Sequence, residues 1–221
     1  MRVAEARWIA NQFAALRPEQ RATVVNIGSS TLAFRTQNQP HIDQLIFAPL
    51  AAAGSKIIHA DLKAAPGVDI AGDLADARVR AQLAALQPNV VLCSNLLEHV
   101  ADPQQFATYI RDLVPPGGKL IVTAPREYPY HADPIDNGYR PTPEQLARVF
   151  ANTSIRVAQV VADTTYLQEL RRKGLAGVKH GVSTFLGAIM NNGDLRRAKR
   201  ERLGHLLTPF TTSCVVLDAD V

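Results

Sequence analysis

The chain has 221 residues, with 24 basic and 20 acidic side chains and a formal net charge of +4. This length suits one α/β domain and is too short for a large multidomain machine. With 47% hydrophobic and 20% charged residues, the composition excludes wholly disordered, collagen-like and coiled-coil chains. We therefore expect a single domain over residues 1–221.

The positive charge is concentrated in one segment. Residues 166–206 carry nine basic and three acidic groups, a net charge of +6, while the rest has 15 basic against 17 acidic groups, or −2. Such a segment is typical of a surface for anionic partners or of a solvated helix face. It has few aromatic side chains, so we expect no nucleic-acid partner, and a peripheral contact with an anionic surface is the hypothesis that we keep.

The N-terminal segment and the cysteines indicate the compartment. Ile9, Phe13 and Leu16 recur at helical spacing, unlike the continuous apolar stretch of a secretory signal. No run approaches the ~18 apolar residues of a transmembrane span. Cys93 and Cys214 each lie in an apolar run without metal-ligand spacing and are predicted to be buried thiols. The expected location is the cytoplasm.

Short apolar runs alternate with segments of helical period, which is the pattern of strands that feed crossover helices. Strands are predicted at 22–28, 56–61, 89–95, 119–125, 154–162 and 213–221, and helices at 75–86, 102–113 and 140–150. The first four runs show little alternation, as expected when both faces of a parallel sheet are covered. The pattern predicts a Rossmann-like, three-layer α/β/α sandwich.

The expected parts of this domain are an N-terminal helix (1–20), a Rossmann-like core (22–164), a basic helical insertion or lid (165–207) and a final strand (212–221). The insertion is too short for a hydrophobic core of its own. It is therefore predicted to be an insertion or a helical lid between the last two strands.

Small and acidic residues follow the predicted strands, at the end of the sheet where such folds bind ligands. Gly28, Ser29 and Ser30 let a backbone approach a ligand closely, and the helix that follows offers free N–H groups. Asp61 can accept hydrogen bonds from both ribose hydroxyls, and Asp73 from an exocyclic amine. Each segment alone is also typical of a turn or helix cap. Neither GxGxxG nor GxxxxGK[ST] is present.

The fourth strand leads into the most specific pattern in the chain. It consists of SNLLEHV (94–100), a DP helix start (102–103) and PPGGKLIVTAP (115–125). The next most specific segment is GVDIAGDL (67–74). Residues 22 to about 150 thereby resemble a class I S-adenosylmethionine-dependent methyltransferase domain, most closely the type 11 group. The resemblance implies a mostly parallel seven-stranded sheet that binds S-adenosylmethionine over its first, second and fourth strands.

The resemblance also implies roles for single residues. By this resemblance, Asn26, Gly28, Ser29 and Ser30 line the methionine moiety, and Asp61 accepts hydrogen bonds from the ribose hydroxyls. Leu62, Asp73 and Leu74 contact the adenine, and Asn95 and Leu96 face the sulfonium. Glu98 and His99 match the motif but are mainly structural in the family.

The loop after the first strand departs from the family pattern. Asn26 stands where the family usually has an acid, and Gly28 is the one glycine kept of three. The chain from Gly28 to Asp61 is longer than the ~20 residues of a nucleotide-binding unit. Because it contains Pro40 and Pro49, its helix is expected to be broken or displaced.

A polar loop at 126–141 follows the strand at 119–125 and is interpreted as an acceptor pocket. Methyl transfer needs an aligned nucleophile and, for a hydroxyl, removal of a proton. His131 is the predicted base, oriented by Asp133 or Asp136. Tyr130, Tyr139 and Arg140 are predicted to hold the substrate. A metal site on the same histidine and aspartates, or a purely structural loop, are alternative interpretations, and no metal is predicted.

The predicted function is methyl transfer from S-adenosylmethionine to an oxygen or nitrogen of a small-molecule or glycan acceptor, by a monomer or homodimer. The alternative is a catalytically inactive methyltransferase-like module that engages a protein or an anionic surface through its basic insertion. The lost glycines favour this alternative, whereas Asp61 and Asp73 disfavour it. An NAD-dependent oxidoreductase would keep Asp61 but requires the absent GxGxxG.

Overall fold

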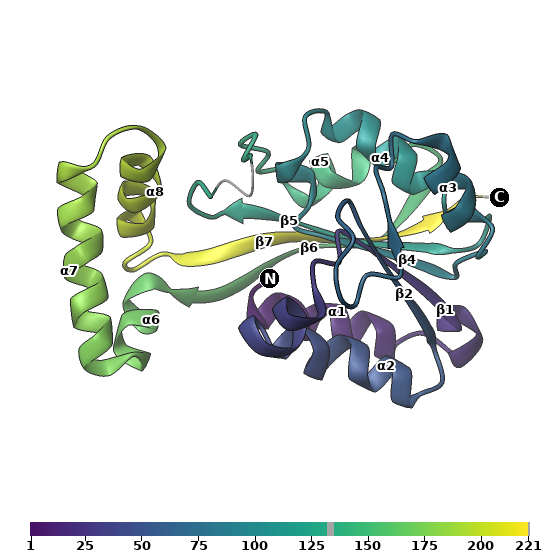
Figure 1. Ribbon diagram of the computed structural model, residues 1–221, viewed down its shortest axis with the longest axis horizontal. Helices are drawn as coiled ribbons and strands as arrows, with labels where there is room; N and C mark the ends of the chain where they lie inside the picture. The colour runs from purple at the N-terminus through teal and green to yellow at the C-terminus, as the bar shows by residue number, and fades with distance from the viewer. Residues whose placement is uncertain (132–134, 221) are drawn as a thin grey trace.

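The computed structural model describes residues 1–131 and 135–220. Its centre is a seven-stranded sheet of order β3-β2-β1-β4-β5-β7-β6 with helices on both faces (Figure 1). The strands are β1 (Thr23–Ile27), β2 (Lys56–Asp61), β3 (Ile70–Ala71), β4 (Val90–Ser94), β5 (Lys119–Glu127), β6 (Thr153–Thr165) and β7 (Pro209–Ala219). The pairings of β7 with β5 and β6 are antiparallel, and the pairings among β1 to β5 are parallel. The predicted fold class is confirmed.

The helices divide between the two faces of the sheet. Helices α1 (Val3–Ala14) and α2 (Ala48–Ala52) cover one face, and α3 (Ala77–Ala84), α4 (Pro103–Arg111) and α5 (Pro143–Arg148) cover the other (Figure 1). Local sequence sets two of these helix starts. The Asp102 carboxylate accepts two backbone N–H groups at the start of α4, and Thr142 forms a capping box at α5.

The chain between β1 and β2 does not form one regular helix. Two π-helical turns, Phe34–Asn38 and Asp43–Phe47, precede the short α2. Pro40 lies between the two turns and Pro49 near the start of α2, because proline has no N–H for a helix interior. The predicted break in this helix is confirmed.

The core has two parts, one on each face of the sheet. Neighbouring residues of β1 alternate between them, with Val24 packed toward α1 and α2 and Val25 toward α3 to α5. Both positions need apolar side chains because helices cover both faces. Cys93 and Cys214 are buried in these two cores as free thiols, as predicted.

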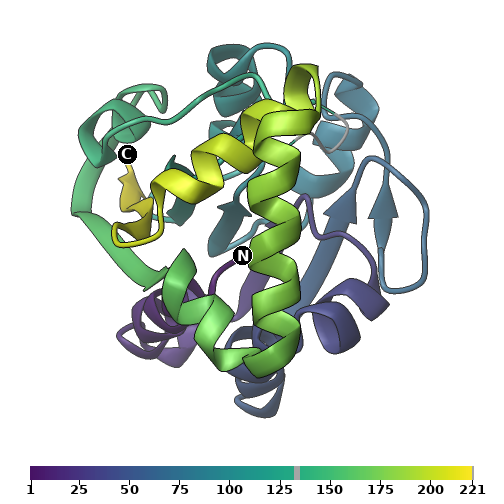
Figure 2. The same ribbon diagram turned by 90° about the vertical axis from the view of Figure 1, so that its left-hand side faces the viewer.

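The hairpin of β6 and β7 extends beyond the rest of the sheet, and its tip carries three helices (Figure 1). These are α6 (Tyr166–Arg172), α7 (Gly174–Met190) and α8 (Gly193–Gly204). We call residues 166–207 the cap. Helix α7 is its outermost element, as the view onto that end of the molecule shows (Figure 2). The predicted helical insertion before the last strand is therefore present.

Candidate active site

A cavity of about 1430 Å³ lies at the carboxyl ends of β1, β2 and β4. All the residues predicted to contact the cofactor line it, namely Asn26, Gly28, Ser29, Ser30, Asp61, Leu62, Asp73, Leu74, Asn95 and Leu96. They come together because the parallel strands end at the same edge of the sheet. What each contributes to ligand binding stays a prediction.

The loop after β1 turns sharply although it keeps one glycine. Gly28 has a φ of +70°, and a Cβ there would lie 2.8 Å from Cδ2 of Leu96. Ser30 takes a left-handed φ of +54°, a conformation that glycine usually supplies, and its N–H donates to Oδ2 of Asp61 at 2.8 Å. The loop therefore keeps a tight turn without the missing glycines.

Arg35 stabilises this turn through hydrogen bonds to its backbone. Its side chain is buried, and Nη1 donates to the backbone oxygens of Ser29 and Ser30 at 2.8 and 2.7 Å. Nη2 donates to the backbone oxygen of Gly67 at 2.8 Å. One guanidinium thus joins the loops that follow β1 and β2. Arg35 is not among the residues predicted from the sequence, because no local motif marks it.

The residues after β2 and β3 differ in how they can meet a ligand. The carboxylates of Asp61 and Asp73 each accept a backbone N–H two residues further on, at 3.3 and 2.8 Å. Leu62 is 62% exposed within the cavity lining, which suits packing against a flat ligand group. Leu74 buries its side chain in the core, so only its backbone can serve the cavity.

Asn26 is buried and its side chain is committed to His59. Nδ2 of Asn26 lies 3.2 Å from Nδ1 of His59. Burial, with the Arg35 guanidinium nearby, lowers the pKa of His59 to about 4, so the ring is neutral and Nδ1 can accept the bond. One N–H of the Asn26 amide is therefore committed to His59.

Glu5 of α1 brings a buried carboxylate to the cavity. Its Oε1 accepts hydrogen bonds from Nδ2 of Asn95 and from Oγ1 of Thr123, both at 2.6 Å. Sequence analysis did not assign Glu5 to the site. The signal was its position four residues before Ile9 and eight before Phe13, which puts it on the buried stripe of the helix.

His131, on the loop after β5, also lines the cavity. Its Nδ1 lies 3.1 Å from the backbone oxygen of Pro129, which can only accept, so Nδ1 carries the proton and Nε2 has the free lone pair. Burial lowers the pKa of His131, with a further contribution from His99. A neutral imidazole near neutral pH can accept a proton from a ligand.

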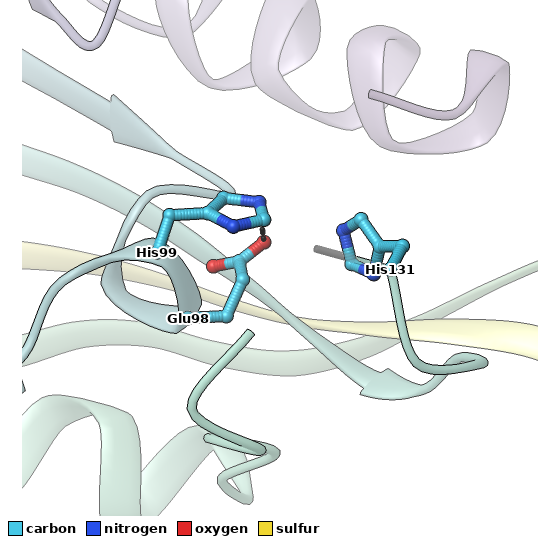
Figure 3. Close-up of side chains that lie close together, drawn as sticks. All are labelled: Glu98, His99 and His131. Atoms are coloured by element: carbon cyan, nitrogen blue, oxygen red, sulfur yellow. Dashed lines mark ion pairs between the residues drawn. The ribbon is translucent and has the colours of Figure 1, made fainter. Parts of the chain in front are cut away.

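Glu98 and His99 lie beside His131 (Figure 3). The Glu98 side chain is fully buried, and neither of its oxygens has a hydrogen-bond partner within residues 1–131 and 135–220. Burial raises its pKa to about 8. Nε2 of His99 lies 3.7 Å from Oε1 of Glu98. Possible ligand atoms of the three residues lie within 4.8 Å of one another, so this group is the metal-compatible cluster of the site.

Asp136 forms its hydrogen bonds with the backbone of the loop and with Arg140, and not with the imidazole ring of His131. Burial alone would raise its pKa, but Arg140 and the backbone N–H groups of His131 and Gly138 lower the pKa to about 2. Its contact with Nδ1 of His131 is 3.5 Å, longer than a hydrogen bond to that ring requires. Asp133 lies outside the described residues.

The predicted substrate residues are not among the lining residues of the cavity, and each contacts another part of the protein. Tyr130 contacts the cap, where its hydroxyl donates to Asp194 at 3.1 Å. Tyr139 packs against the core, and Arg140 binds Asp136 at 2.6 Å. Tyr128, which sequence analysis did not single out, lines the cavity and stacks edge-on with His131. Acceptor binding by the three predicted residues stays a prediction.

The family of the chain follows from comparison with known sequences. The model of a family described as a methyltransferase domain matches residues 10–178. The chain therefore belongs to this methyltransferase family, and the predicted resemblance is confirmed. No curated protein matches the chain.

Solved structures share the fold at low sequence identity. Coclaurine N-methyltransferase bound to N-methylheliamine and S-adenosylhomocysteine is 10% identical, with 98% of this chain and 70% of that chain covered and a TM-score of 0.55. Haemonchus contortus phosphoethanolamine N-methyltransferase 2, in complex with phosphomonomethylethanolamine and S-adenosylhomocysteine, is 13% identical, with coverages of 98% and 52% and a TM-score of 0.51. The family and the ligands of these two structures support S-adenosylmethionine as the expected cofactor.

A third structure shows the limit of such likeness. The [4+2]-cyclase SpnF is 15% identical, with 99% of this chain and 81% of that chain covered and a TM-score of 0.51. The fold alone therefore does not determine the reaction, which has to be argued from the site.

Proposed function

We propose that the cavity binds S-adenosylmethionine together with a small-molecule or glycan acceptor, and that the chain methylates an oxygen or nitrogen of that acceptor. The observation that carries the proposal is the assembly of every predicted cofactor residue in one cavity at the ligand end of the sheet. When bound, the cofactor supplies an electrophilic methyl group on a sulfonium.

The residues present fit such a cofactor. The turn at Gly28 has no room for a side chain, and the Leu62 side chain is exposed in the cavity. Asp61 keeps lone pairs for ribose hydroxyls, because each of its oxygens accepts a single backbone bond. We assign the ammonium of the methionine moiety to Glu5, since its carboxylate is the charged group that α1 brings to the cavity, whereas the Asn26 side chain is a neutral amide that contacts His59.

His131 is the proposed base for a hydroxyl acceptor. Its Nε2 is the acceptor atom of the neutral ring, and proton removal in the transition state is the contribution that an imidazole makes best near neutral pH. Because burial lowers its pKa below the ordinary value of 6.5, turnover is expected to fall only when the pH drops through that lowered value.

Calorimetric titration with S-adenosylhomocysteine tests the cofactor site. We expect saturable binding that Asp61→Asn weakens about tenfold through the lost charge-assisted bonds to ribose. Asp76→Asn is the matched control, because Asp76 caps α3 outside the cavity and asparagine caps equally well. No heat of binding for the wild-type protein at saturating ligand would refute the proposal.

Formation of S-adenosylhomocysteine in the presence of sugars and hydroxylated metabolites tests catalysis. We expect His131→Asn to abolish turnover and to leave affinity for S-adenosylhomocysteine within about twofold of wild type. His180→Asn in the cap is the control and should leave both unchanged. Loss of both properties in His131→Asn would assign His131 a structural role. Binding without turnover of any acceptor would favour the inactive module.

A further inference from the structure

Helix α7 exposes an apolar face that packs against nothing in the part of the chain that the structure describes. Seven large apolar side chains on it are 48% to 86% exposed: Leu175, Val178, Val182, Phe185, Leu186, Ile189 and Met190. Their spacing of three and four residues places them on one stripe. The opposite stripe faces the rest of the cap, since a Cβ on Gly177 would meet α6 and a Cβ on Gly187 would meet α8.

The cap surface around this stripe is strongly basic. Its acidic side chains are all used within the protein: Glu169 pairs with Arg2, Asp194 accepts from the Tyr130 hydroxyl, and Glu201 pairs with Arg197. Within residues 1–131 and 135–220, Arg197 is also the one cap cation that forms an ion pair. The positive charge of the cap is therefore left for an external partner.

A shallow groove on the same surface is lined both by side chains of the apolar stripe and by basic side chains of the cap. It has a volume of about 570 Å³ and an apolar floor from Val178, Val182, Leu186 and Met190, and Lys179 and Lys199 are among its remaining lining residues. Apolar side chains flanked by lysines suit a lipid, with its acyl chain on the floor and its anionic headgroup against the ammonium groups.

We propose that the cap docks on an anionic lipid bilayer, with α7 lying in the plane of the interface. An outward apolar stripe with flanking cations is the arrangement of interfacial helices. No helix of the described residues is long and apolar enough to cross a membrane, so the contact stays at the surface. A second copy of the chain is disfavoured as the partner, because a symmetric contact would bring two basic caps together.

Docking would also bring the cavity close to the bilayer. Glu169 and Arg172 of α6, with Lys173 at the start of α7, are part of the cavity lining. Part of the cavity lining therefore belongs to the cap, whose helix α7 would contact the lipid. This placement of the cavity is independent of the reaction that occurs there.

Sedimentation with vesicles tests the charge. We expect binding to vesicles of equimolar phosphatidylcholine and phosphatidylglycerol, weak binding to phosphatidylcholine alone, and release by salt. Arg171→Gln with Lys179→Gln should lower the partition about twenty-fivefold, at about fivefold for each charge. Lys56→Gln with Arg148→Gln is the matched control, because it removes the same charge from exposed sites outside the cap.

Substitution of the apolar stripe tests insertion. Phe185→Ser with Ile189→Ser should abolish vesicle binding, while Ile155→Ser with Val160→Ser, on exposed positions of β6, should leave it unchanged. Circular dichroism and melting temperature show whether each variant is folded. Three results would overturn the proposal: equal binding to both kinds of vesicle, a dimer in the absence of lipid that the stripe variant dissociates, or tighter binding to a DNA duplex than to anionic vesicles.

Discussion

The sheet and the cap place their apolar side chains in opposite ways. In β1 and β4 every apolar residue is buried against helices on one face or the other. In α7 the large apolar residues face outward, and the buried positions are small, such as Gly177 and Ala188. The comparison shows that the apolar content of a segment does not locate the core. The apolar surface of the sheet is buried within the protein, whereas the apolar surface of the cap is exposed and available to a partner.

The two regions also place their charged side chains in opposite ways. The core buries Arg35, Glu5 and Glu98 at the ligand end of the sheet. Hydrogen bonds hold Arg35 and Glu5 in place, whereas Glu98 is enclosed without a hydrogen-bond partner among the described residues. The cap leaves almost all of its charged groups at the surface. Substitutions in the core should therefore change stability and ligand binding in the cavity together. Substitutions on the outer face of the cap should leave both unchanged and should affect only the binding of lipid.

Removing the Arg35 guanidinium should have the largest effect. Arg35→Met leaves the backbone oxygens of Ser29, Ser30 and Gly67 without their donor. At about 1 to 3 kcal/mol for each buried unpaired group, we expect urea unfolding to show a loss of about 4 kcal/mol. Calorimetry should show no binding of S-adenosylhomocysteine. Arg148→Met, at an exposed site, should stay within about 0.5 kcal/mol of wild type.

Replacing the buried carboxyl group of Glu98 should have the next largest effect, and one that depends on pH. Its pKa rises from 4.5 when unfolded to about 8 when folded, so the folded state binds an extra proton between these values and loses stability as the pH rises through them. Glu98→Gln removes this loss. Relative to wild type, its free energy of unfolding should improve by about 3 kcal/mol between pH 5 and pH 8, at no more than about 1.4 kcal/mol for each pH unit.

The control for this pH dependence is Glu127→Gln. Glu127 is exposed at the end of β5, so its substitution should leave the slope of stability against pH unchanged. A parallel pair of curves for wild type and Glu98→Gln would mean that Glu98 is ionised and has a partner in the folded protein.

Short-range patterns made most of the fold predictable from sequence. The ends of β2 and the starts of α4 and α5 depend on neighbouring residues, and the cofactor residues lie together because parallel strands share an edge. Arg35 and Glu5 were not predictable in their roles, because they bind Gly67 and Asn95, which lie 32 and 90 residues away. Composition also did not reveal where side chains of the loop at 126–141 would point.

Substituting Gly28 in the turn after β1 should lower stability by a smaller amount, and Gly117 provides a matched control. Gly28→Ala combines strain at a φ of +70° with a Cβ contact of 2.8 Å to Leu96, whereas Gly117→Ala has a φ of +80° and no atom near its Cβ. We expect losses of about 2 and about 1 kcal/mol in urea unfolding. Adding Leu96→Ala should relieve part of the loss only at Gly28. Equal losses for both alanines would show that Leu96 moves away freely.

Truncating Leu175 of the cap should have the smallest effect and tests the comparison directly. Leu175 is 86% exposed on α7, while Leu83 of α3 is fully buried, so the same change to alanine removes packing only in the second case. We expect urea unfolding to show about 3 kcal/mol lost for Leu83→Ala and less than about 0.5 kcal/mol for Leu175→Ala. If Leu175→Ala cost more than about 1 kcal/mol in lipid-free protein, the stripe would already be packed in solution. Its exposure would then no longer distinguish the cap from the core.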